Sequence, residues 1–451
     1  MSSSYLDRIA QFAAGLRWAD LPPQVVDRTQ WLLLDSIAVM VAGAREPRVG
    51  ALCAMLRRRG SQGQSHFFGD GTRGDAADAA MVNATAACAH VLDEGHKYAR
   101  GHVGTYVLPA VLAVAQEREV SSGDMLTALV AAYEISARMG MACRVRESMH
   151  PSGTWGTLGA AAAVARLMGM NESDIRQSMN VAAPMTLATS WQAATQGATV
   201  RDLYSGQGAA NAVMAPRWVQ AGFTGSDDDV SHVFGHVSAE HFDREVAQAG
   251  LGSQWELMRS YFKIHACCRN FQSGIDAALD LCKRHGLTGS DIVSVRADTF
   301  AAPARDNIEP RPANVLAAKE SFPVSLALTL VNGRCDQSVF TQAHVAEPEV
   351  ARLAAACTVK FDPELDALAP EQRPSRITLS LRDGRTVSEY AAVARGDPSR
   401  PLTTQELEAK FDELVGAGLG AARASAIKQA VRDIDERAAL GNLMRLLGPA
   451  V

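Results

Sequence analysis

The sequence predicts a mainly helical protein, in which a large all-helical domain built from both chain ends carries an inserted smaller α+β domain. Up to about residue 265, apolar residues recur at three- and four-residue spacing, which is typical of packed helices. After about residue 270, short runs alternate apolar and polar residues, as strands do. Helical patterns return near residue 403. We therefore expect a helical domain over 1–268 and 396–451, and an α+β domain over 269–395.

Four segments of the first part illustrate the helical pattern. Residues 25–41 and 124–139 carry apolar residues at helical spacing, and residues 81–92 and 156–168 are rich in alanine. An exposed alanine face would bury little apolar area, so the last two helices must pack closely on their neighbours. The polar, glycine-rich segment 60–74 is expected to be a surface loop and nothing more.

The strand pattern is clearest in two places. Residues 292–299 alternate, and residues 376–381 run through Asp383-Gly384 into a second alternating run over 386–390. An Asp-Gly pair between two such runs predicts a β-hairpin. Thr403-Thr-Gln-Glu406 then has the form of a capping box and predicts that a helix follows over 407–414.

Composition limits the class of protein. The 451 residues are 47% apolar and 21% charged, with a formal net charge of -5. There is no apolar run long enough for a membrane span, no signal-like N-terminus and no Lys/Arg-rich block. Eight cysteines occur without C-x-x-C spacing, which favours reduced, mostly structural thiols. We expect a soluble cytoplasmic protein whose partners include neither nucleic acid nor membrane.

The segment 90–104 concentrates groups suited to acid/base chemistry. It holds three histidines, two acids, a lysine and an arginine, with glycines that imply an irregular backbone. The plainer alternative is a solvated loop after a buried helix. A metal-dependent hydrolase using His90, Asp93, His96 and His102 is another alternative. On a continuous helix, however, His90 and His96 would point roughly 240° apart, which would prevent a common ligand face.

Two later segments carry further candidates. His150 precedes Pro151, which favours an extended backbone leading into a helix start, where free amides can hold an anion. Lys263 and Arg269 could supply positive charge for substrate carboxylates. Cys268 follows Cys267 without a recognisable base nearby, a pattern that favours core packing over a nucleophile.

Taken together, these motifs resemble the MmgE/PrpD family, and the resemblance covers essentially the whole chain. The motifs that carry it are Leu33-Leu-Asp35-Ser-Ile-Ala, Val82-Asn83-Ala, His90-x-x-Asp93, Gly101-His102-x-Gly104, His150-Pro-x-Gly-x-x-Gly156, Ala221-Gly-Phe-Thr-Gly225, Lys263-x-x-x-x-Cys268-Arg269, Ala318-Lys-x-Ser321, Pro401-Leu-Thr403 and Lys410-Phe411.

The resemblance implies a helical domain with a lid-like α+β domain, usually in a homodimer. It also implies chemistry on a small anionic polycarboxylate without metal or organic cofactor, as in 2-methylcitrate dehydratase, cis-aconitate decarboxylase and iminodisuccinate epimerase. By position, it assigns catalysis to Asp93, His102, His150 and Lys263. We further expect the substrate to be bound by a second set, namely His96, Lys97, Cys268 and Arg269.

In this interpretation His102 and His150 are base and acid on opposite faces of the substrate, and Asp93 orients His102. Dehydration of a 2-methylcitrate-like acid ranks first and epimerisation second. Decarboxylation ranks third, because the segment Gly206-Gln-Gly-Ala-Ala210 lacks the basic residue that those decarboxylases carry there, and Cys268 and Val324 stand where they carry a histidine and a tyrosine. A catalytically inactive scaffold kept for dimerisation is a further alternative.

Overall fold

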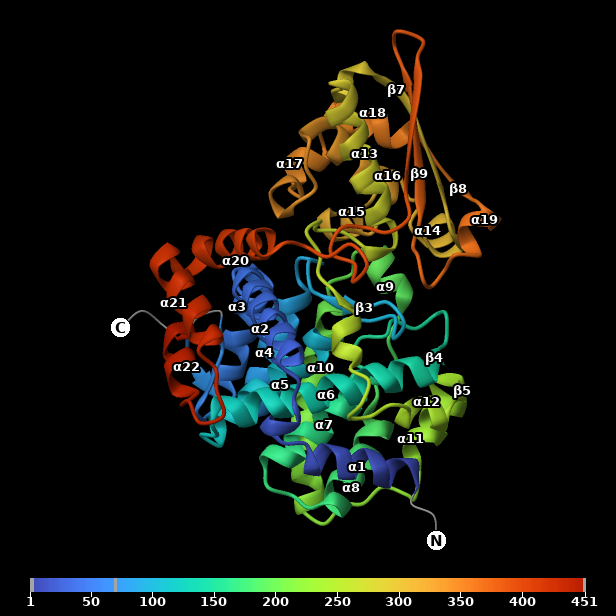
Figure 1. The fold of residues 1–451 in the computed structure, drawn as a ribbon. Coiled ribbons are helices and arrows are strands. Elements are labelled where there is room, and N and C mark those ends of the chain that lie inside the picture. The colour runs from blue at the N-terminus through green and yellow to red at the C-terminus, as the bar shows by residue number, and fades with distance from the viewer. Residues whose placement is uncertain (1–3, 69–70, 449–451) are drawn as a thin grey trace.

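The computed structural model describes residues 4–68 and 71–448, and in it the chain is mainly helical, as predicted (Figure 1). Helices from both ends of the sequence lie together in one part of the molecule, here called the helical body (residues 4–261 and 404–448). Its helices are α1 (Tyr5–Gly15), α2 (Pro23–Gly43), α3 (Pro47–Arg58), α4 (Ala76–Cys88), α5 (Val103–Glu117), α6 (Ser122–Ala142), α7 (Gly156–Leu167), α8 (Glu172–Ala182), α9 (Trp191–Thr195), α10 (Val200–Gln220), α11 (Asp229–His232), α12 (Arg244–Gln248), α20 (Thr404–Leu419), α21 (Ala421–Arg432) and α22 (Gly441–Leu447).

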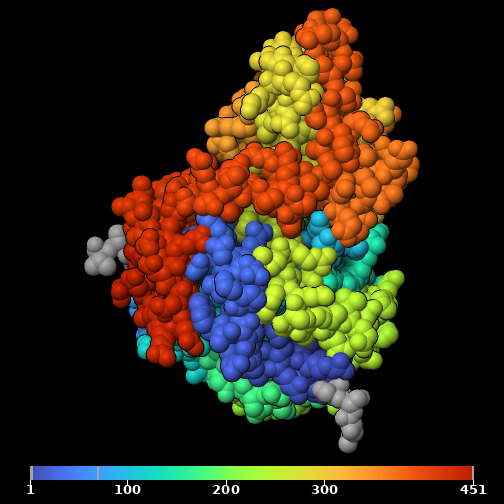
Figure 2. All heavy atoms as spheres, viewed as in Figure 1, coloured from blue at the N-terminus to red at the C-terminus, as the bar shows by residue number. Residues whose placement is uncertain are grey.

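The remaining elements form a second part, here called the upper unit (residues 272–391), which stands above the helical body in Figures 1 and 2. Its elements are α13 (Gln272–His285), β7 (Ile292–Thr299), α14 (Ala301–Asp306), α15 (Val315–Lys319), α16 (Phe322–Asn332), α17 (Gln342–Val345), α18 (Pro348–Ala355), β8 (Cys357–Phe361), α19 (Pro363–Asp366), β9 (Ser375–Leu381) and β10 (Thr386–Ala391). The expected domain boundaries near 268 and 396 stay predictions.

A four-stranded mixed sheet organises the upper unit. The strand order is β10-β9-β7-β8, with β7 parallel to β8 and antiparallel to β9. The hairpin predicted at Asp383-Gly384 is confirmed, because β9 and β10 pair antiparallel and Gly384 adopts φ 87°. Helices α13 and α16 pack beside the sheet, and Phe271 stacks on Phe322 with ring centroids 4.8 Å apart.

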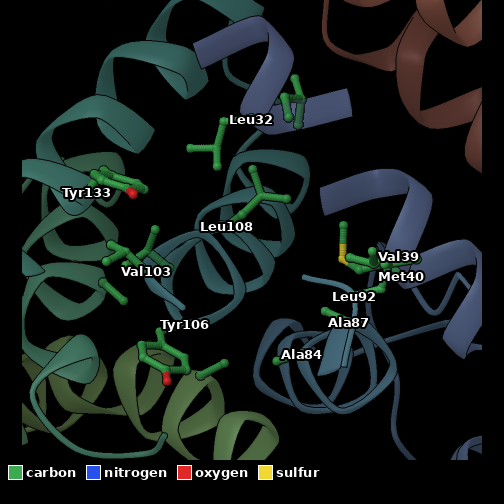
Figure 3. Close-up of a cluster of buried hydrophobic side chains, with 14 of the residues drawn as sticks. Leu32, Val39, Met40, Ala84, Ala87, Leu92, Val103, Tyr106, Leu108 and Tyr133 are labelled. Atoms are coloured by element: carbon green, nitrogen blue, oxygen red, sulfur yellow. The ribbon is translucent and has the colours of Figure 1, made fainter. Parts of the chain in front are cut away.

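The alanine-rich helix α4 lies at the centre of the helical body, between α2, α5 and α10. Figure 3 shows Ala87 near Val39 and Met40 of α2. The close packing predicted for this helix is therefore confirmed. Its predicted end at residue 92 is wrong: the helix ends at Cys88, because Val91 adopts a left-handed backbone with φ 56°.

The expectation that 60–74 is only a surface loop is also wrong. Strands β1 (Ser65–His66) and β2 (Arg73–Gly74) pair antiparallel, and Phe67 is fully buried. The Asn83 side chain of α4 fastens this segment, since it accepts from the Phe68 N–H at 3.0 Å and donates to the His66 carbonyl at 2.9 Å. Residues 69 and 70 lie outside the described part of the chain.

A buried ion pair joins the last part of the chain to the first. The capping box predicted at Thr403 and Glu406 is confirmed at the start of α20. One turn further on, Lys410 Nζ lies 2.5 Å from Asp35 Oδ1 of α2 and also donates to the Leu92 carbonyl at 3.0 Å. Both charged side chains are almost fully buried, so this pair holds α20 against α2.

None of the helices within the described residues combines the length and the apolar character needed to cross a membrane.

Replacing Lys410 by methionine should destabilise the protein by about 3–5 kcal/mol, because the Asp35 carboxylate would remain buried without its partner. Urea unfolding would measure the change. The matched control is Lys428→Met, which removes a more exposed pair with Asp412 at 2.7 Å and should cost less than about 1 kcal/mol. Equal losses in the two variants would contradict a structural role for the buried pair.

Candidate active site

An irregular segment between α4 and α5 forms the centre of the site. Residues Gly95 and His96 form a short strand, β3, that pairs with β6 (Ser260–Tyr261). Gly95 is required at this crossing, because a Cβ would overlap the Tyr261 hydroxyl and the backbone of Gly101. Because this segment is not helical, the chain can turn so that Asp93 and His102 lie side by side.

Asp93 and His102 form a buried acid–imidazole pair. His102 Nδ1 lies 2.7 Å from the Glu94 carbonyl and 3.2 Å from Asp93 Oδ2, while Thr105 Oγ1 donates to Asp93 Oδ2 at 2.9 Å. Because both neighbours of Nδ1 are acceptors, the neutral ring carries its proton on Nδ1. Nε2 is then an unprotonated acceptor, as a general base requires.

The charges of this pair follow from its surroundings. Burial lowers the pKa of His102 to about 4, although the Asp93 carboxylate opposes the shift. Burial acts to raise the pKa of Asp93, but its interactions with His102 and Lys263 lower it to about 2. At neutral pH the pair is therefore a carboxylate beside a neutral imidazole.

His150 has the complementary tautomer. The Ser152 N–H donates to His150 Nδ1 at 3.2 Å, so the neutral ring carries its proton on Nε2. Burial and the nearby charge of Arg201 lower the pKa of His150 well below its ordinary value. The ring stacks on Trp191 with centroids 5.2 Å apart. His150 can therefore donate a hydrogen bond where His102 can accept one.

Two buried cations accompany the histidines. Lys263 Nζ donates to the Val91 carbonyl at 3.0 Å and lies 3.7 Å from Asp93 Oδ1. Arg201, on α10, donates to the Cys88 carbonyl at 2.8 Å, and its buried Nε has no hydrogen-bond partner in the described structure. Sequence reasoning missed Arg201, because an Arg-Asp pair at the start of a helix is indistinguishable from a surface pair.

These groups line one cleft of about 490 Å³. Its walls come from the helical body, from residues 263–270 that follow it, and from residues 300–306, Glu320 and residues 366–373 of the upper unit. The lining is strongly cationic, with nine Lys/Arg residues (Lys97, Arg100, Arg144, Arg146, Arg201, Lys263, Arg269, Arg305 and Arg373) against four acids (Glu147, Asp306, Glu320 and Asp366). A protein of net charge -5 therefore presents a local basic pocket, which suits an anionic ligand.

Three of the four predicted substrate-binding residues line this cleft. Lys97 Nζ donates to the Glu371 carbonyl at 2.7 Å, and Arg269 lies over the Tyr261 ring at 4.3 Å. Both cations also face Asp397, at 3.5 and 3.6 Å respectively. Cys268 is buried in the wall, where burial raises the pKa of its thiol, so it is a poor nucleophile.

His96 is placed differently from its expected role. Its ring is fully buried outside the cleft lining, with Nε2 3.1 Å from Glu256 and Nδ1 accepting from the Ala99 N–H at 3.1 Å. Both ring nitrogens are therefore engaged by the protein. His96 therefore lies behind the cleft wall, and its predicted contact with substrate stays a prediction.

The four residues required by the metal hypothesis do not converge. His90 faces Glu46 at 3.6 Å, His96 faces Glu256, and only Asp93 and His102 are paired. Within residues 4–68 and 71–448, no cluster of three or more His, Cys, Asp or Glu side chains could hold a metal ion.

Comparison with known proteins gives matches along nearly the whole chain. The MmgE/PrpD N-terminal domain matches residues 7–240, and the MmgE/PrpD C-terminal domain matches residues 265–436. A cis-aconitate decarboxylase from Aspergillus terreus is 24% identical over 473 residues, covering 99% of this chain and 96% of the relative. A cis-aconitate decarboxylase from Homo sapiens is 23% identical over 435 residues, covering 91% and 88%.

The His102 ring should titrate with a midpoint near pH 4 in the folded protein, and replacing Asp93 by asparagine should lower the midpoint further because the carboxylate favours the imidazolium. NMR of histidine labelled with ¹⁵N would measure this, with the signal assigned by its loss in His102→Gln.

Between pH 6.5 and about 4 the unfolded chain binds a proton that the folded ring does not, so His102 should reduce stability as pH falls through this range. The His102→Gln variant should show a shallower loss of stability over the same range. A midpoint at the ordinary value of 6.5 would contradict the assignment.

Proposed function

Since the chain belongs to the MmgE/PrpD family, we propose that it is an enzyme that removes a proton beside a carboxylate of a small di- or tricarboxylic acid. The observation that carries the proposal is the presence of two neutral imidazoles with opposite tautomers in one cationic cleft. One ring offers a lone pair and the other an N–H, which are the two functions that such a reaction needs.

Proton removal is assigned to His102. A hydrogen beside a carboxylate is weakly acidic, and its removal leaves carbanion-like charge that must be stabilised. His102 Nε2 is free to accept the proton, while Asp93 stabilises the imidazolium that forms. Lys263 and Arg201 are placed to bind the adjacent carboxylate and to stabilise the developing charge.

The second role, donation of a hydrogen bond to the leaving group, is assigned to His150. Its neutral ring presents Nε2–H, so it can donate a hydrogen bond to a departing hydroxyl group or to a carbonyl oxygen while staying uncharged. The proton that converts the departing hydroxide to water is then the one that His102 has taken from carbon, so that both rings end neutral. Together, the two histidines would support loss of water across a carbon–carbon bond. We therefore propose a lyase, with dehydration of a 2-methylcitrate-like hydroxy acid as its reaction.

Decarboxylation is the second candidate, because both relatives described above are named cis-aconitate decarboxylases. Against it, Cys268 occupies the position expected for a histidine in those enzymes, and its protonated thiol is a poor acid/base group at neutral pH. Epimerisation would use the same two histidines if the proton returned to the opposite face. The homodimer implied by the family resemblance stays a prediction.

The purified enzyme should exchange the hydrogen beside a carboxylate for deuterium and release water when it is incubated in deuterated water with hydroxy-tricarboxylates and hydroxy-dicarboxylates. Proton and carbon NMR would follow exchange, new vinylic signals, lost carboxyl carbon and inversion separately. His102→Gln should slow exchange by roughly 10²–10⁴-fold, because it removes the base. His150→Gln should slow water loss more than exchange.

The matched control is His285→Gln, which alters an exposed histidine on α13 outside the cleft and should leave all rates unchanged. Melting temperatures would show that each variant is folded. Exchange at the wild-type rate in both cleft variants would refute the assigned groups, and loss of activity on chelation would favour the metal-dependent alternative. Loss of the carboxyl carbon without loss of water would instead establish the decarboxylase.

A further inference from the structure

A strained arginine stands next to the catalytic pair. Arg100 has φ 59°, in the left-handed region that few residues other than glycine adopt. It lies in a tight turn closed by the His96 N–H, which donates to the Gly101 carbonyl at 2.8 Å. Within the described residues only Val91, Arg100 and Glu119 share this feature among non-glycine residues. Backbone strain of this kind clusters at binding and active sites, and of the two exposed residues among the three only Arg100 lines the cleft.

Arg100 also lacks a counterion. Arg100 lines the cleft as an exposed residue, and its side chain makes neither a hydrogen bond nor an ion pair with another described residue. Burial and the like charges of Arg144 and Arg373 lower its pKa. Three guanidinium groups near one another repel, and an anion between them would remove the repulsion.

Arg373 approaches from the opposite wall. It belongs to the loop before β9 of the upper unit, and its Nη2 donates to the Lys97 carbonyl at 3.1 Å, within the same turn that carries Arg100. It has no carboxylate partner among the described residues. Arg144, in contrast, pairs with Glu147 at 3.1 Å in an exposed position. Arg100 and Arg373, the two cleft arginines without a carboxylate partner among the described residues, therefore both line the part of the cleft around the 96–101 turn, and their like charges act on one another.

We propose that Arg100 and Arg373 bind a second carboxylate of the substrate, remote from the carbon that loses its proton. The inference rests on the proposed function and extends it: Lys263 and Arg201 hold the carboxylate beside the reacting carbon, and the outer pair selects acids with a further carboxylate. The guanidinium groups suit this task, because each can make two parallel hydrogen bonds to a carboxylate. The bound acid would thereby join the two walls of the cleft.

Binding of unreactive acids tests this without requiring turnover. Titration calorimetry would compare butyrate, glutarate and propane-1,2,3-tricarboxylate on the wild type and on Arg100→Gly. Glycine relieves the strain, so this variant should melt at the same or a higher temperature than the wild type. It should nevertheless bind the two polycarboxylates at least tenfold more weakly, while butyrate binding changes less than twofold.

The matched control is Glu119→Gly, which relieves the same kind of strain at φ 50° in the exposed turn between α5 and α6 and removes no cleft charge. It should leave all three affinities unchanged. Arg100→Lys should recover only part of the lost affinity, because lysine keeps the charge but not the planar fork. If both arginines hold one carboxylate, Arg100→Gly with Arg373→Ala should weaken binding by less than the product of the single effects.

Unchanged polycarboxylate binding in Arg100→Gly, or equal weakening of butyrate and glutarate, would overturn the inference even if the wild type proved to be a dehydratase. Selective weakening would support the inference even if no substrate in the turnover assay reacted. The two proposals can therefore fail separately.

Discussion

The buried negative charge of Asp93 is the constraint on which the site depends. An isolated carboxylate in the protein interior is unstable by several kcal/mol, so it needs partners with good geometry. Those partners come from separate segments: His102 from the turn before α5, Thr105 from α5 itself, and Lys263 from the chain after β6. Because these groups must meet at one carboxylate, the site depends on the packing of α5 and of the chain after β6 against the segment that carries Asp93.

The two histidines become different reagents through the hydrogen bonds behind them rather than through their residue type. A backbone carbonyl and a carboxylate face Nδ1 of His102, whereas a backbone N–H faces Nδ1 of His150. Burial keeps both rings uncharged. In the proposed reaction the two rings would therefore need no change of protonation before proton removal starts, and the surrounding guanidinium and ammonium groups would supply the positive charge.

The sequence predicted what depends on local pattern: the mainly helical class, the hairpin at Asp383-Gly384 and the capping box before α20. The sequence also indicated several of the candidate site residues that line the cleft. It could not predict Arg201, because only tertiary packing turns a helix-start arginine toward the histidines. His96 is a candidate that the sequence suggested and the structure finds outside the cleft lining. Its place among reactive residues in the sequence cannot reveal that its ring nitrogen contacts Glu256 in the folded protein. The pairing of β1 with β2 could not be predicted, because a polar, glycine-rich segment has the composition of a loop.

The link from Lys410 to Asp35 and to the Leu92 carbonyl has a consequence for biosynthesis. Leu92 directly precedes Asp93, so a residue more than 300 positions later in the sequence supports the backbone that carries the Asp93 carboxylate. During translation the first helices leave the ribosome long before α20 does, and domains generally fold as they emerge. A nascent chain that has not yet been synthesised through α20 therefore lacks this support for the backbone before Asp93.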